Sequence, residues 1–296
     1  MKKSNAFVFG IIAAIIIVLS FLSARGSYRN LPKEKPVSMT QGYNKGRVDD
    51  SIRNEESSNK NDIAKKTNEK KDNEGKTKID VDKSQMQKNG QILVYIDPGH
   101  QAKGDPKLEP TAPGSGNQKA RVSAGAVGIS TRKPEYVLNL EAAEVLKNIL
   151  IDKGFKVMMT RETHDVNISN AERARLGNEA KADIVVRVHG DSIADTSKTG
   201  ASILVPSKIS PYTKGIFEKS NYVAESVKKE MEGSGIKVNG IFERSDLTGF
   251  NWSTVPVFLV EMGFMSNYNE DQMLSNPDYQ AKLMQAVANG IENSFK

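Results

Sequence analysis

The sequence has 296 residues, a formal net charge of +6 and no cysteine. The positive charge does not indicate a nucleic-acid-binding protein, because the basic excess lies near the N-terminus. Residues 25–90 contain 16 Lys and Arg against 11 Asp and Glu, whereas residues 91–296 contain 24 against 25. The absence of cysteine excludes disulfides, thiolate metal ligands and a thiol nucleophile, so any metal site must use histidines and carboxylates.

An apolar segment at residues 6–24 follows Lys2 and Lys3. Its length matches the roughly 20 residues with which an α-helix crosses a bilayer. A buried core helix would normally keep a polar face, and a cleaved signal peptide would have an apolar region of only about 7–15 residues. We therefore predict a retained transmembrane signal anchor at residues 1–24, with a cleaved signal peptide as the alternative. Either reading predicts that the rest of the chain is exported.

Residues 25–90 are rich in Lys, Glu, Asn, Asp and Ser, and their apolar residues are scattered singly. Such a segment cannot bury enough apolar surface to offset the conformational entropy lost on ordering. We predict a disordered charged linker at residues 25–90, which joins the anchor to one folded domain at residues 91–296.

The folded part alternates short β-branched segments with helical periodicity. Strands are predicted at residues 92–96, 155–160, 184–188, 201–205 and 255–260, and helices at residues 134–154, 169–181, 212–231 and 277–295. This alternation predicts an α/β fold, a single domain with a mostly parallel central sheet flanked by helices. Residues 101–131 are rich in Gly, Pro, Ser and Lys and are expected to form a long loop,.

Three residues of the metal-binding or acid–base type stand at carboxyl ends of predicted strands. His100 lies four residues past the first strand, and His189 and Glu261 directly follow two others. Ligand sites in open α/β sheets form at this edge, and Glu135, in the first turn of a predicted helix, can reach it. Two His and one Glu are a familiar zinc set, to which a further carboxylate adds proton transfer. The residues alone leave simpler roles open: the histidines could be ordinary loop or hydrogen-bonding residues, and Glu135 could only complement the positive end of its helix. The third histidine, His164, is expected on a surface turn.

Five segments in chain order resemble the zinc-dependent N-acetylmuramoyl-L-alanine amidase family. They are IDPGH at 96–100, EYVLNL at 135–140, TR at 160–161 with Asp165 and Arg173, VHGD at 188–191, and VEMGFMSN at 260–267. The resemblance extends over residues 91–296. It implies that His100, Glu135 and His189 bind one Zn²⁺ and that Glu261 is catalytic. Arg187, where many members have Ser, and Gly190, where Ala is usual, depart from the family pattern.

The family's reaction is hydrolysis of the amide that joins N-acetylmuramic acid to L-alanine in peptidoglycan. The resemblance therefore implies a peptidoglycan hydrolase on the extracytoplasmic side of the cell membrane, held there through residues 6–24, or secreted to the cell wall if the N-terminus is cleaved. Asn251 is expected beside the substrate groove, and Trp252 either there or in packing.

Two alternatives remain open from the sequence. One is a zinc peptidase that acts on the stem peptide, and the other is a non-catalytic cell-wall binding or regulatory protein. A protein activator is compatible with the sequence, which identifies none.

Overall fold

The computed structural model describes residues 90–296. The predicted anchor at residues 1–24, and the predicted linker up to residue 89, lie outside the described part of the chain. Among the helices of residues 90–296, none combines the length and the apolar character needed to cross a bilayer.

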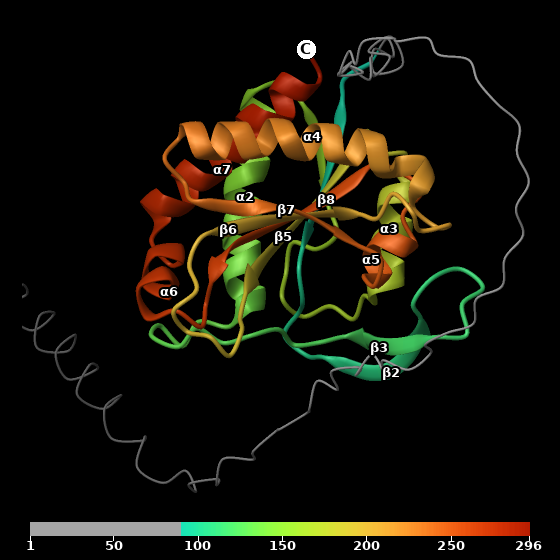
Figure 1. Cartoon of the computed structure of the whole chain (residues 1–296), viewed down its shortest axis with the longest axis horizontal. Coiled ribbons are helices and arrows are strands. Elements are labelled where there is room, and N and C mark those ends of the chain that lie inside the picture. The colour runs from blue at the N-terminus through green and yellow to red at the C-terminus, as the bar shows by residue number, and fades with distance from the viewer. Residues whose placement is uncertain (1–89) are drawn as a thin grey trace, which may run out of the picture. The chain divides into compact units, whose positions relative to one another are not determined.

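The described residues form eight strands and six helices (Figure 1). In chain order they are β1 (Leu93–Pro98), β2 (Asp105–Pro110), β3 (Gln118–Val122), α2 (Glu135–Asp152), β4 (Lys156–Met159), α3 (Asn170–Glu179), β5 (Ile184–Asp191), β6 (Ala201–Pro206), α4 (Lys214–Gly233), β7 (Val238–Arg244), α5 (Thr248–Asn251), β8 (Val257–Phe264), α6 (Tyr268–Leu274) and α7 (Pro277–Ser294). Six strands form one sheet in the order β4-β1-β5-β8-β6-β7, and β2 pairs with β3 in a separate hairpin.

Helices cover both faces of the six-stranded sheet, as predicted. Alternate residues of the central strands pack into two cores, because successive side chains of a strand point to opposite faces. The larger core joins the sheet to α2, α4 and α7, and the smaller core joins it mainly to α3 and α5. Figure 1 shows α2 and α7 on one side of the strands and α3 and α5 on the other.

The sheet is mostly parallel, which confirms the predicted fold class. β1, β5 and β8 are parallel neighbours, so their carboxyl ends meet at one edge. β6 runs antiparallel to β8. A parallel pairing would need a crossover segment, usually a helix, that returns the chain to the edge of the sheet where β5 begins. The loop from β5 to β6 contains no helix, so β6 runs in the opposite direction. α4 supplies such a crossover between β6 and β7, which are again parallel.

The expectation of a structureless loop at residues 101–131 was wrong, because this segment contains the β2–β3 hairpin. Its sequence lacks the alternation typical of a strand, and contacts with the rest of the domain hold it. The Glu109 carboxylate accepts a hydrogen bond from the Ala171 amide at the start of α3, and Asn170 Nδ2 donates to the Arg121 carbonyl. The strand β7 and the short helices α5 and α6 were also not predicted.

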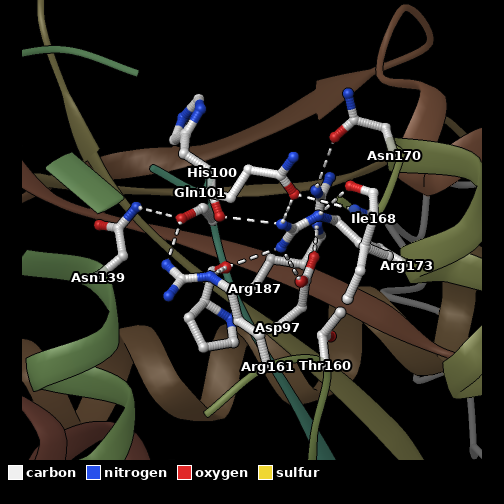
Figure 2. Close-up of polar contacts among 12 residues, drawn as sticks. Asp97, His100, Gln101, Asn139, Thr160, Arg161, Ile168, Asn170, Arg173 and Arg187 are labelled. Atoms are coloured by element: carbon white, nitrogen blue, oxygen red, sulfur yellow. Dashed lines mark hydrogen bonds and ion pairs between the residues drawn. The ribbon is translucent and has the colours of Figure 1, made fainter. Parts of the chain in front are cut away.

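Asp97, one residue before the end of β1, is buried on the α3 side of the sheet. Its two carboxylate oxygens accept hydrogen bonds from Arg173 of α3 and Arg187 of β5, both at 2.8 Å (Figure 2). Burial alone would raise the pKa of Asp97, but the two guanidinium groups outweigh it and hold this pKa well below its usual value,. Arg187, a departure from the family pattern, thus serves as the second partner of Asp97. Its guanidinium packs where Gly249 leaves room, since a Cβ there would lie 2.3 Å from Arg187 Nη1.

We expect Asp97→Asn to lower the free energy of unfolding by roughly 3–5 kcal/mol, because it removes the charge that compensates two buried arginines. Asp195→Asn is the matched control: Asp195 is exposed, and its loss should cost about 0.5 kcal/mol or less. Denaturant unfolding measures both.

The contribution of Asp97 is complete above the pKa of an unfolded aspartate, about 4, and is lost as pH falls through the lower folded pKa. Wild type should therefore lose more stability than the Asn variant below pH 4; equal losses would contradict this account.

Candidate metal centre

The structure brings His100, Glu135 and His189 together at the carboxyl edge of the sheet. Glu135 Oε1 lies 3.0 Å from His100 Nε2 and 3.2 Å from His189 Nδ1. The two imidazole rings are edge to face, with centroids 4.9 Å apart. One donor atom from each of the three residues lies within 4.8 Å of the others. His189 stands within β5, rather than after it as predicted.

The backbone at His100 fixes the direction of its ring. His100 has φ 60°, a left-handed conformation that is uncommon for residues other than glycine. Its Nδ1 lies 3.0 Å from the Ser123 carbonyl oxygen and 3.1 Å from the Ser123 hydroxyl oxygen. In the tautomer that donates to the carbonyl, Nδ1 carries the proton. In a neutral ring Nε2 then has a lone pair, and this lone pair faces the Glu135 carboxylate. Two acceptors in that arrangement need a proton or a cation between them.

Glu135 begins α2, and the surrounding residues hold its carboxylate in one orientation. Its Oε2 accepts a hydrogen bond from the Ala126 amide at 2.8 Å, and its Oε1 accepts one from Asn139 Nδ2 at 3.2 Å. Asn139 is one helical turn further on, which places it on the same face of α2. Burial opposes the ionised form of Glu135, but hydrogen bonds with His100 and His189 outweigh burial and keep its pKa below the usual value.

The ring of His189 packs directly on the backbone of Gly99. A Cβ at Gly99 would lie 2.2 Å from His189 Cε1, so this close approach requires glycine. Burial lowers the pKa of His189 to about 4, and the ring is therefore neutral at pH 7, as a metal ligand must be. His189 Nε2 is buried and has no hydrogen-bond partner among the described residues.

These side chains fit a divalent metal ion that prefers nitrogen and oxygen ligands. Two ligands on a tetrahedral zinc, each at about 2.1 Å, are about 3.4 Å apart, which is close to the two distances between Glu135 Oε1 and the imidazole nitrogens. His100 Nε2 and His189 Nδ1, the two nitrogens that give these distances, are placed to share a cation with Glu135 Oε1.

Glu261 lies in β8, directly beside His189 in the β5–β8 register. The sequence predicted it just after the strand, and the structure extends β8 beyond it to Phe264. Glu261 is half-buried, and its Oε2 is shielded from solvent without a hydrogen-bond partner in the described part of the chain. Burial, followed by the negative charges of Asp191 and Glu135, raises the pKa of Glu261 well above its usual value. A shielded carboxyl group with a raised pKa at this edge of the sheet is a candidate for proton transfer.

Helix α6 fixes the two loops that border this edge of the sheet. Asp271 is fully buried and accepts hydrogen bonds from the Ser130 and Thr131 amides, both at 2.7 Å. Glu270 accepts hydrogen bonds from the amides of Gly200 and Phe264. The loop held by Asp271 also contains the Ala126 amide that binds Glu135, so α6 stabilises the surroundings of the metal centre.

Two other sequence expectations have different outcomes. Trp252 packs, since its Nε1 donates to the Pro110 carbonyl and its ring stacks with Arg175. Asn251 donates to the Thr111 and Ser245 carbonyls, so it contributes to holding the hairpin.

At Gly190 the space that an alanine Cβ would need is taken by Met265, whose Sδ would be 3.0 Å away.

The sequence did not single out Ser123, Asp191 or Asp271. Asp191 follows the VHGD histidine by two residues, which is a signal that could have identified it. Ser123 and Asp271 carry no such signal, because their roles come from backbone contacts between segments far apart in the sequence.

Comparison with known proteins agrees with this geometry. The sequence profile of the N-acetylmuramoyl-L-alanine amidase family matches residues 94–293. An N-acetylmuramoyl-L-alanine amidase of Mycobacterium tuberculosis is 24% identical over 68% of this chain and 85% of its own. The germination-specific N-acetylmuramoyl-L-alanine amidase of Bacillus subtilis is 26% identical over 69% of this chain and 79% of its own.

Solved structures show the same fold. The crystal structure of the amidase Ami1 from Mycobacterium abscessus superposes with a TM-score of 0.63 at 24% identity, over 69% of this chain and 99% of the other. An N-acetylmuramoyl-L-alanine amidase from Clostridium difficile superposes with a TM-score of 0.55 at 26% identity, over 69% of this chain and 96% of the other.

Proposed function

The chain belongs to the N-acetylmuramoyl-L-alanine amidase family, and from this premise we propose that it cleaves peptidoglycan with a zinc ion held by His100, Glu135 and His189. The bond cleaved is the amide between N-acetylmuramic acid and L-alanine of the stem peptide. The single observation that supports the zinc site is the convergence of one carboxylate and two imidazoles within 4.8 Å.

A bound zinc ion supplies a Lewis acid for the amide carbonyl and lowers the pKa of water. Glu261 takes the proton of the attacking water and transfers it to the alanine nitrogen, which leaves as an amine. Its raised pKa supports this role, because a carboxyl group that holds a proton more tightly than an ordinary glutamate is the stronger base,. Asn139 and the Ala126 amide keep the Glu135 carboxylate in place.

We also propose that residues 91–296 are the catalytic domain, that residues 6–24 anchor it in the cell membrane, and that residues 25–90 are the spacer between them. The domain then faces the cell wall, or is released to it if the N-terminus is cleaved. The supporting observation is the sequence of the N-terminal segments, with an apolar run followed by a charged stretch.

We expect each folded domain to bind one zinc ion and the variants His100→Ala and His189→Ala to lose most of it. A structural-scale zinc site contributes on the order of 10 kcal/mol of apparent binding free energy, and losing one of three protein ligands removes much of that. His164→Ala is the matched control, because the third histidine lies outside the cluster. Elemental analysis of the purified proteins measures the metal; near-full zinc in both ligand variants would refute the assignment.

Glu261→Gln should keep its zinc and its fold but lose roughly 10²–10⁴-fold in rate, because an amide cannot accept and return the proton. Glu218→Gln, at an exposed position of α4, should leave the rate unchanged. The measurements are metal content, unfolding, and release of peptides that begin at L-alanine from purified muropeptides. Zinc lost with the Glu261 carboxylate would make Glu261 a ligand, and a rate within a few fold of wild type would place the proton transfer elsewhere.

Removal of residues 1–90 should leave a folded and active enzyme, since both described cores consist of residues after Gly90. The test is a thermal or denaturant unfolding curve of residues 91–296, together with muropeptide hydrolysis. Loss of a cooperative transition would mean that the N-terminal segment belongs to the folding unit.

A further inference from the structure

A surface cavity of about 510 Å³ lies between residues 103–107 and residues 165–167. The first segment follows His100 directly, and the second belongs to the turn between β4 and α3. The cavity therefore lies along the chain segment that leads away from His100, and none of the chemistry described so far uses the side chains around it.

Three charged side chains at this cavity have no partner. Lys103, Lys107 and Asp165 line it, and within residues 90–296 their side chains form no hydrogen bond or ion pair. Asp105, the other acidic residue of the lining, is buried and pairs with Arg121 at 2.9 Å. The cavity thus presents two ammonium groups and one carboxylate, all available to a ligand that carries both signs of charge.

Buried contacts fix the walls of the cavity before any ligand binds. The Ala102 amide donates to the His164 carbonyl at 3.1 Å, which joins the two segments. The buried Gln101 side chain accepts a hydrogen bond from the Ile168 amide at 3.1 Å and donates to the Lys103 carbonyl at the same distance. A preformed site of this kind loses little conformational entropy on binding.

The cavity lies within reach of a peptide held at the metal centre. Lys103 is three residues from His100, so their Cα atoms are at most about 11 Å apart. Gly104 packs against the 123–124 backbone, since a Cβ there would be 3.2 Å from the Ala124 amide nitrogen, and Ser123 in turn contacts the His100 ring. Two residues of extended peptide span about 7 Å, and a long side chain on that peptide spans the remaining distance to the cavity.

We propose that this cavity binds the zwitterionic end of a diamino acid, the third residue of the stem peptide. Lys103 and Lys107 bind its carboxylate, and Asp165 binds its ammonium group. Diaminopimelate has such a side chain, whereas lysine at the same position offers only the ammonium group. The proposal rests on the proposed function, because the peptide must be held with its L-alanine amide at the metal centre.

The test compares two N-acetylmuramoyl tetrapeptides that end in D-alanine, one with meso-diaminopimelate and one with L-lysine at the third position, as substrates of the full-length chain; the fourth residue blocks the α-carboxyl group of the third. The double variant Lys103→Gln/Lys107→Gln should raise KM about 10-fold for the diaminopimelate substrate, since charge-assisted hydrogen bonds are lost. It should leave kcat, and KM for the lysine substrate, within about twofold. Asp165→Asn should raise KM for both substrates.

Lys229→Gln, at an exposed position of α4, and the unfolding midpoints of all variants serve as controls. The proposal is overturned if the double variant changes KM for neither substrate, or for both equally. If wild type releases no peptide from either substrate, the proposed function fails. In that case calorimetry with the free tripeptide L-alanyl-γ-D-glutamyl-meso-diaminopimelate tests the proposed binding site by itself. Weaker binding to the double variant than to wild type supports the proposed site, and equal binding to both proteins overturns it.

Discussion

Two buried guanidinium groups donate hydrogen bonds to three successive backbone carbonyl oxygens, those of Pro98, Gly99 and His100. The candidate metal centre depends on this arrangement. Arg161 binds the first two, and Arg173 binds the first and the third. These bonds replace the sheet pairing that β1 loses at its end, and they hold His100 in its left-handed conformation, which would otherwise cost about 1–3 kcal/mol. Burial and the charge of Arg173 lower the pKa of Arg161 to about 10, so the Arg161 guanidinium group remains charged at neutral pH.

The same edge of the sheet gives two carboxylates opposite properties. Glu135 accepts hydrogen bonds from a backbone amide and from Asn139 and faces two imidazoles, so its ionised form is favoured. Glu261 has an oxygen without any donor among residues 90–296 and lies near two other carboxylates, so its protonated form is favoured. Separation of this kind supports the proposed roles, in which one carboxylate holds a cation and the other moves protons.

Five of the six strands of the sheet, the four long helices, the mostly parallel pairing and the convergence of His100, Glu135 and His189 could be predicted, because these features follow from hydrophobic periodicity and from motifs at strand ends. The hairpin β2–β3 could not, since its strands contain prolines and charged residues and are held by contacts with α3 and α5. The environment that raises the pKa of Glu261 was equally hidden. It arises from burial and from the charges of Asp191 and Glu135, which are brought near Glu261 by the pairing of β5 with β8 and by the position of α2.

The position of β8 in the sheet has a consequence for the time at which the enzyme becomes active. β8 is the last strand of the chain, yet it lies between β5 and β6. A chain whose synthesis stops before residue 257 lacks both Glu261 and the strand that joins the two halves of the sheet, so it has neither the proposed proton-transfer group nor a complete core. An amidase with this strand order is therefore inactive until β8 has been made and inserted between β5 and β6.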